Sequence, residues 1–399
     1  MTASRQFGEI AGGLTPHVLA ARIESVDRAL EMADLTLPLE IARYRASLET
    51  YLRGDGPPPG RWEYGPVETR DLLRQVDECN AAVSAAAPFA LRSTVESHLH
   101  HERELLLGVG DDAAYSAYCL TVHGLPTPET IAEAHQILEH PVAADADQRV
   151  DAHTVCERIR RGLDGYGLAH WRVEASDRMA ARVSVSRAHH RVRVRLDARF
   201  TDSEVVRLVV HEVGGHVLRS HNAEVQAEPL SPHALGSTVP TEEGLAAWLE
   251  TWAGADSSRV IRTYAARVVA VDLAQKAGLI EVAEALTDYV SISQAAEIAT
   301  RVKRGLRDPH GAGGLTKDHG YLSGLFAITA IIRQQGYSVL PLLFATKWPL
   351  SELPLVRSLV GAGLMVPATT LPDSERLGLR DDLGPRSLSE LLAAVEMEN

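Results

Sequence analysis

The sequence has few cysteines and no long apolar run. Its three cysteines, Cys79, Cys119 and Cys156, lie far apart and form no CxxC pair, which excludes a disulfide framework and a thiolate zinc site. No run of about 18 apolar residues occurs, and the N-terminus has no basic head followed by an apolar stretch. We therefore expect a cytoplasmic protein with no membrane partner.

Basic residues are also fewer than acidic residues. The 40 Lys and Arg residues face 53 Asp and Glu residues, so the net charge is -13, which repels phosphate backbones. No basic stripe offsets this total, and we expect no nucleic-acid partner. With 399 residues, 45% of them hydrophobic, the chain is long enough to bury a substantial core. Lys317 stands out because it is one of few lysines and lies in a glycine-rich segment.

Apolar periodicity divides the chain into regions. Helical spacing dominates residues 1–150, whereas residues 169–196 alternate apolar and polar side chains, which is typical of about three half-buried antiparallel strands. Helical spacing returns afterwards. We predict a predominantly helical α+β fold, with an N-terminal helical region over 1–150 and a second domain over 151–399, in which a small antiparallel sheet packs on a helix.

One segment contains residue types that suit metal-dependent catalysis. It is His211-Glu212-Val213-Gly214-Gly215-His216. Thr201 to Glu204 form a capping box that opens the helix leading into it. Two imidazoles can bind Zn²⁺, and an adjacent carboxylate can act as the general base for the water that zinc activates. We therefore predict Zn²⁺ as cofactor, His211 and His216 as ligands, and Glu212 as the base. The domain over 151–399 is then a zincin-like catalytic domain whose small antiparallel sheet packs on this active-site helix.

The spacing of the two histidines requires a distorted helix. In the common HExxH motif the histidines are four residues apart, which places them within about 40° on a helix that turns about 100° per residue. Here they are five apart, or about 140°. An extra residue in that turn, as in a π-bulge, brings them together, and Gly214 and Gly215 ease such a distortion. The alternative is a buried helix that ends at the glycines and has no metal.

A catalytic zinc needs a third protein ligand. The next helix is expected to begin near Thr241, and Glu242 and Glu243 follow it directly. A carboxylate in a first turn is also stabilised by the helix dipole, whatever its function. Spacing alone does not choose between the two glutamates.

At this point the motifs resemble a known family. HEVGGHVLRSHN, EEGLA and GGLTKDHGYLSG resemble the microtubule-associated tyrosine carboxypeptidase family, and within it the bacterial QEGLA-motif (flavohemoglobin expression-modulating) branch. The resemblance covers roughly residues 150–370. It implies that His211, His216 and Glu243 bind zinc and that Glu212 is the base. Gly215 replaces the usual Thr and Glu242 the usual Gln, and the extra charge of Glu242 is expected to bear on substrate preference.

The segment around Lys317 predicts substrate-binding groups. Lys317 and Tyr321 are four residues apart and share a face if this stretch is helical. A cation that holds a carboxylate and a phenol that stabilises an oxyanion suit exopeptidase chemistry. Arg301 and Arg304 are further candidates for the carboxylate. The alternative is a surface lysine and a core tyrosine.

The sequence thus supports a zinc metallocarboxypeptidase that takes a peptide or protein C-terminus as substrate. The alternatives are a catalytically silent zinc-binding regulatory protein, or a zinc peptidase of another cleavage direction, a dipeptidyl peptidase or an endopeptidase. A second histidine-rich segment, with His98, His101 and Glu102, is expected to be a solvated helix face. The oligomeric state is not predicted.

Overall fold

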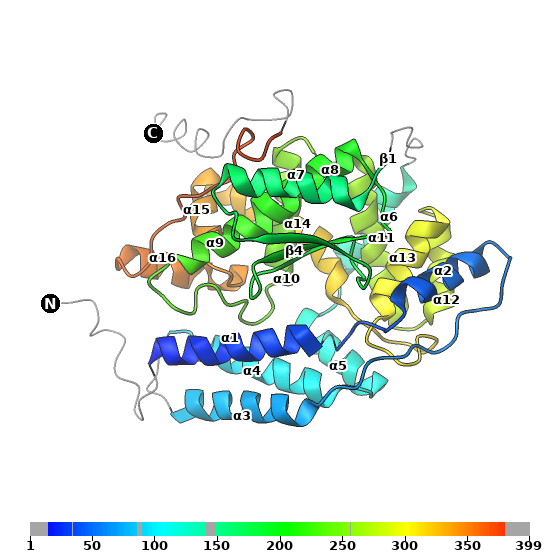
Figure 1. The fold of residues 1–399 in the computed structure, drawn as a ribbon, viewed down its shortest axis with the longest axis horizontal. Coiled ribbons are helices and arrows are strands. Elements are labelled where there is room, and N and C mark those ends of the chain that lie inside the picture. Colours follow the sequence, from blue (N-terminus) through cyan, green and yellow to red (C-terminus); the bar gives the residue numbers. More distant parts are fainter. Residues whose placement is uncertain (1–14, 34, 86–89, 141–148, 256, 380–399) are drawn as a thin grey trace.

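A computed structural model describes residues 15–33, 35–85, 90–140, 149–255 and 257–379. Within these residues helices dominate and the strands are few and short (Figure 1). The predominantly helical α+β class is therefore confirmed. The residues with alternating polarity form three strands, β2 (Arg172–Ser176), β3 (Val183–Ser186) and β4 (Arg191–Arg195).

The three strands form a mixed sheet in the order β2-β4-β3. β3 and β4 are antiparallel, with Val183 opposite Val194, as expected. β2 and β4 are parallel, with Arg172 opposite Arg191, so the expectation of a wholly antiparallel sheet is wrong for this pair. Alternating polarity reports which face of a strand is buried and carries no information on strand direction.

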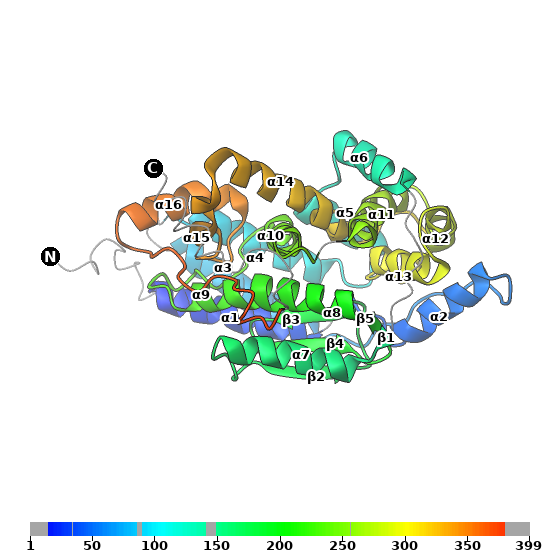
Figure 2. The same ribbon diagram turned by 90° about the horizontal axis from the view of Figure 1, so that it is seen from above.

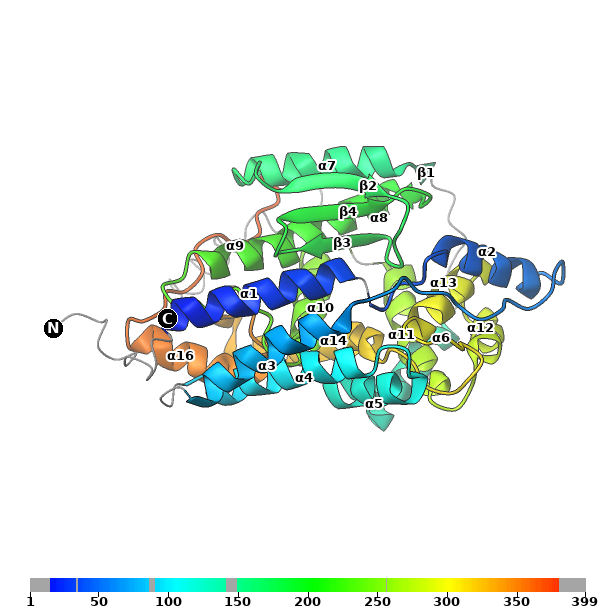
Figure 3. The ribbon, with the colours of Figure 1, turned by 60° about the horizontal axis from the view of Figure 1, so that its bottom comes forward.

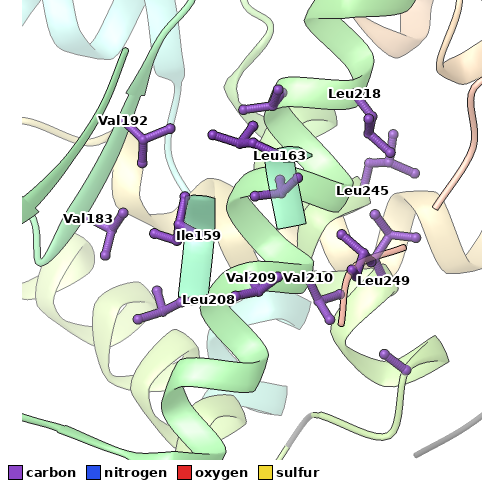
Figure 4. Packing of buried hydrophobic residues seen from close by; sticks show 14 of the residues in the cluster. Ile159, Leu163, Val183, Val192, Leu208, Val209, Val210, Leu218, Leu245 and Leu249 are labelled. Carbon is purple, nitrogen blue, oxygen red and sulfur yellow. The ribbon is translucent and has the colours of Figure 1, made fainter. Parts of the chain in front are cut away.

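The helix with the histidines lies between the sheet and another helix. It begins as α8 (Asp202–Leu208), continues as the π-helix η2 (Val209–Val217) and ends as α9 (Leu218–Glu224). The predicted capping box is present, because the Thr201 and Glu204 side chains bond each other's backbone N–H groups. Figure 4 shows apolar side chains of this helix packed against the sheet and α7 (Ala152–Gly165) on one side and against α10 (Val239–Trp252) on the other.

Two glycines let α10 cross α14 (Gly320–Gln335) at close range. A Cβ on Gly244 would lie 2.2 Å from the carbonyl carbon of Gly324, so neither position has room for a side chain. The crossing brings the first turn of α10, with Glu242 and Glu243, beside the first turn of α14, with Tyr321. Backbone packing, rather than a polar contact, therefore sets this part of the site.

The N-terminal helices share apolar cores with later parts of the chain. One core joins α1 and α4 to the C-terminal helix α16, and another joins α6 to α11 (Figures 1 and 2). The division into regions 1–150 and 151–399 stays a prediction. These helices are α1 (Pro16–Ala33), α2 (Ile41–Leu52), α3 (Thr69–Ala85), α4 (Arg92–Leu107), α5 (Asp112–His123) and α6 (Pro128–Glu139).

The remaining elements complete the scaffold around the site. They are β1 (Arg149–Val150), which pairs with β5 (Phe200–Thr201), α11 (Ser258–Ala274), α12 (Leu279–Thr287), α13 (Ile292–Lys303), η3 (Lys317–His319), η4 (Tyr337–Val339), α15 (Leu340–Leu343), η5 (Leu350–Glu352) and α16 (Leu353–Gly361). In Figure 3, α7 covers one side of the sheet, and β3 is the strand nearest α1. The side-chain hydrogen bond between Ser186 and Glu31 (2.8 Å) joins these two elements.

The cysteines and the helices agree with the expectations drawn from composition. Cys79, Cys119 and Cys156 are all buried and unpaired, so no disulfide links them. None of the helices in the described residues is both long and apolar enough to span a bilayer.

Candidate metal centre

The two histidines share one face because the helix widens between them. Val209–Val217 is a π-helix, and the Leu218 N–H donates to Val213 O, five residues back. The distortion predicted from the five-residue spacing is therefore confirmed. The rings of His211 and His216 lie 5.0 Å apart between centroids.

Glu243 faces both imidazoles from α10. Its Oε2 atom lies 3.3 Å from His211 Nε2 and 3.7 Å from His216 Nε2. This oxygen is buried and accepts no hydrogen bond within the described residues. A tetrahedral zinc with ligand distances of about 2.0–2.1 Å separates its ligands by about 3.3–3.4 Å. The 3.3 Å separation matches this geometry, and the 3.7 Å separation is slightly longer than it requires.

The other nitrogen of each imidazole faces a second carboxylate. His211 Nδ1 lies 2.7 Å from Glu250 Oε1, and His216 Nδ1 lies 3.2 Å from Glu242 Oε2. A carboxylate only accepts hydrogen bonds, so in the neutral imidazole each Nδ1 carries the proton and each Nε2 presents its lone pair. Carboxylates in this position orient metal-binding histidines and raise their basicity.

Glu250 is a functional candidate that sequence reasoning missed. Its side chain is fully buried, and it accepts hydrogen bonds from Arg207 Nη1 (2.8 Å) and from the hydroxyl of Tyr264 (3.0 Å) as well as from His211. The spacing in the sequence could have indicated it, because Glu250 follows Glu243 by seven residues and both therefore lie on the same face of a helix.

Glu242 is held by cations as well as by His216. Arg219 Nη1 and Lys347 Nζ both donate to its carboxylate. Burial opposes ionisation, but Arg219 and Lys347 outweigh it and hold the pKa of Glu242 far below its usual range. The charge that this glutamate adds relative to the glutamine of the resembled family is therefore balanced within the protein.

The site favours a positive charge at the imidazoles. Burial opposes protonation of His211, but the carboxylates of Glu243 and Glu250, which face its two ring nitrogens, outweigh it and raise its pKa to about 10. Burial likewise opposes ionisation of Glu243, yet both histidines hold the pKa of this carboxyl well below its usual range. Ligand atoms of His211, Glu212 and His216 also lie within 4.8 Å of one another.

Two cavities meet at this centre. A narrow cavity of about 300 Å³ extends along α8 and α11, and a wide cavity of about 530 Å³ extends toward α1 and α4. Glu212 lines both, and its carboxylate forms no hydrogen bond or ion pair with any described residue, which leaves it available to a substrate or water. The residues shared by the two cavities are Ala181, Val183, His211, Glu212, Arg301 and Tyr321.

The residues predicted around Lys317 all line the wide cavity. They are the substrate-binding candidates Lys317, Arg301 and Arg304 and the catalytic candidate Tyr321. Burial and the nearby Arg304 lower the pKa of Lys317 to about 8. Arg301 donates two hydrogen bonds to Asp318, at 2.7 and 3.0 Å, so part of its guanidinium is already engaged. The ring of Tyr321 stacks 6.2 Å from that of His211.

The second histidine-rich segment is not a solvated face. His98 is buried, and its Nε2 lies 3.3 Å from Asp27 Oδ1. Both residues and Glu102 line the wide cavity, and the expectation of a solvated face is wrong for the buried His98, whereas Glu102 is half-buried. Packing of α4 against α1 decides this burial, and one helix read alone does not reveal it.

Comparison with known proteins agrees with the motifs. The chain has no significant match among individually curated proteins. The profile of one family, described as microtubule-associated tyrosine carboxypeptidase, matches residues 62–378. This span covers most of the chain and includes every residue of the candidate centre. The chain therefore belongs to the microtubule-associated tyrosine carboxypeptidase family.

Proposed function

We propose that this protein is a zinc-dependent carboxypeptidase that removes the C-terminal residue from peptides or proteins. One observation supports the zinc: the buried Oε2 of Glu243 has no hydrogen-bond partner among the described residues and lies 3.3 and 3.7 Å from two imidazole Nε2 atoms. His211, His216 and Glu243 are the ligands in this proposal. Three protein ligands leave one position open, as catalytic zinc sites do.

The residues around the metal ligands have separate roles in the proposed reaction. When bound, zinc supplies a Lewis acid that polarises the scissile carbonyl and lowers the pKa of water. Glu212 takes the proton of the attacking water and delivers it to the leaving amine. Tyr321 lies beside His211 and donates a hydrogen bond to the developing oxyanion. Glu250 and Glu242 hold the two imidazoles in place.

A carboxypeptidase must also bind a free carboxylate. Lys317, Arg301 and Arg304 were predicted for this role and lie beside the metal ligands in the wide cavity. The family description names tyrosine, so a C-terminal tyrosine is the first residue to test. The net charge of -13 gives no long-range attraction for an acidic protein tail.

The test of catalysis is Glu212→Gln. Purified protein is incubated with a mixed peptide library with and without a chelator, and the products are read by mass spectrometry. We expect the wild type to shorten peptides by one C-terminal residue, the chelator to stop cleavage, and Glu212→Gln to retain zinc while losing nearly all activity. A wild type that binds zinc and cleaves nothing would instead support the silent regulatory protein.

The test of cleavage direction uses C-terminal amidation. A free carboxylate that becomes buried needs a positive, hydrogen-bonding partner, so an amidated peptide should be cut far more slowly than the free acid. Equal rates, or fragments from internal bonds, would contradict the carboxypeptidase and favour an endopeptidase.

A further inference from the structure

The narrow cavity is lined by more arginines than glutamates, the glutamates being Glu204, Glu212 and Glu297. Of these arginines, the proposed mechanism assigns substrate binding only to Arg301. Arg182 is paired with Glu204 (2.6 Å), Arg207 with Glu250 (2.8 Å) and Arg301 with Asp318 (2.7 Å). The five arginines that line this cavity are Arg182, Arg207, Arg259, Arg267 and Arg301.

Arg267 differs from the three paired arginines, because its guanidinium forms no hydrogen bond or ion pair with any described residue. Its Nε and Nη1 atoms are buried without an acceptor. The guanidinium lies 4.3 Å from the ring centroid of Tyr321 and 5.7 Å from that of Tyr264. Cation–π contacts hold it in place but do not satisfy its N–H donors. A guanidinium with two buried N–H donors that no described residue satisfies favours a bound anion, and this one contacts the ring of Tyr321, which lies beside His211.

The edge strand β3 runs past both cavities, so a peptide paired with its free edge reaches the two cavities one after the other. Ala181 and Val183 line both cavities, Arg182 lines only the narrow one, and residues 184–188 line only the wide one. β3 is an outer strand of the sheet, and Arg182 O accepts from Arg195 N on the β4 side. Because neighbouring residues direct their backbone groups to opposite sides, the N–H and C=O groups of Val183 and Val185 are directed to the free edge.

A peptide added to this edge has a defined direction. Antiparallel pairing is the more frequent and slightly more stable arrangement. A peptide antiparallel to β3 runs from the wide cavity past Glu212 into the narrow cavity, so its C-terminus enters the narrow one. The volumes agree, since about 300 Å³ suits the last residue and about 530 Å³ suits the preceding chain.

We infer that Arg267 binds the free carboxylate of the C-terminal residue inside the narrow cavity. This inference rests on the proposed carboxypeptidase function and replaces Lys317 in the role of carboxylate partner. Lys317 lines only the wide cavity and contacts the peptide upstream of the cleaved bond. The planar guanidinium of Arg267 offers the two parallel N–H donors that match a carboxylate.

The experiment compares one peptide as free acid and as C-terminal amide. The kcat/KM ratio of acid to amide is measured for wild type, Arg267→Met, Arg267→Lys and Lys317→Met. We expect Arg267→Met to lower kcat/KM for the acid by about tenfold to hundredfold more than for the amide. Arg267→Lys should retain part of the ratio because it keeps the charge, and Lys317→Met should keep the full ratio.

Binding gives a readout that does not depend on turnover. In a Glu212→Gln background, the Kd of the free acid should rise with Arg267→Met by a similar factor, while the Kd of the amide stays constant. Arg43→Met, at an exposed arginine far from the site, is the matched control. Zinc content and circular dichroism report folding, and the Arg267→Lys comparison remains informative if Arg267→Met folds poorly.

The outcomes separate the two proposals. A ratio that collapses with Lys317→Met but survives Arg267→Met, or that falls equally in both, overturns the inference and leaves the carboxypeptidase intact. A wild type that cuts acid and amide equally contradicts the proposed function itself.

Discussion

His211 Nδ1 lies 2.7 Å from Glu250 Oε1, on the side of the ring opposite Glu243. One helix, α10, thus supplies carboxylates to both nitrogens of the same imidazole. The first carboxylate faces the metal position, and the second fixes the tautomer and the ring orientation. Arg207 and Tyr264 in turn hold Glu250 in place.

Replacing Glu250 should weaken the metal centre without removing a ligand. We expect Glu250→Gln to lower zinc affinity by about 10- to 100-fold, measured by competition with a chelator. It should also lower the free energy of unfolding by about 3 kcal/mol, because Arg207 loses its buried counter-charge. Glu139→Gln, on the exposed end of α6, should change neither quantity. Unchanged zinc affinity in Glu250→Gln would contradict the orienting role.

The two glutamates at the start of α10 should differ in their effects. Glu243→Ala removes the oxygen that faces both Nε2 atoms, so zinc affinity should fall by more than the 10- to 100-fold typical of an outer partner. Glu242→Ala should keep more zinc and mainly destabilise the fold, since Arg219 and Lys347 lose their shared carboxylate. Metal analysis with thermal unfolding separates the two effects. Equal zinc loss would contradict the distinction.

A side chain at Gly215 should disturb the packing of the site. A Cβ there would lie 2.9 Å from Ala246 Cβ, so Gly215→Ala forces η2 and α10 apart. We expect a loss of about 1–3 kcal/mol in the free energy of unfolding, together with weaker zinc binding. Ala246→Gly added to Gly215→Ala should restore zinc binding. Gly60→Ala, where a Cβ meets no atom within 4 Å, is the control.

Glu102 should make stability depend on pH. Burial raises its pKa to about 7 from a usual value near 4.5, with a further contribution from the charge of Asp27. The folded state therefore binds more protons than the unfolded state between these values, and stability falls as pH rises through this window. Glu102→Gln stays neutral, so it should gain about 1–3 kcal/mol over the wild type at pH 8 and nothing below pH 4.5. Denaturant unfolding at both pH values tests this, and a constant difference would contradict it.

The sequence by itself determined the local parts of this protein. The five-residue spacing of His211 and His216 requires a widened turn for a shared ion, and a π-helix is present there. The Thr201 capping box and the strand periodicity also depend on near neighbours, and both were predicted correctly. These features are readable because the groups that decide them lie within a few residues of one another.

Only the tertiary structure decided how these parts face one another. Glu242 and Glu243 are adjacent, so their side chains point about 100° apart on the helix, and the rotation of α10 decides which of them faces the histidines. The close crossing of Gly244 and Gly324 limits that rotation. Partners such as Lys347, which joins Glu242 from 105 residues away, depend on long-range packing. No local pattern encodes such a contact, because its two ends meet only after the cores have formed.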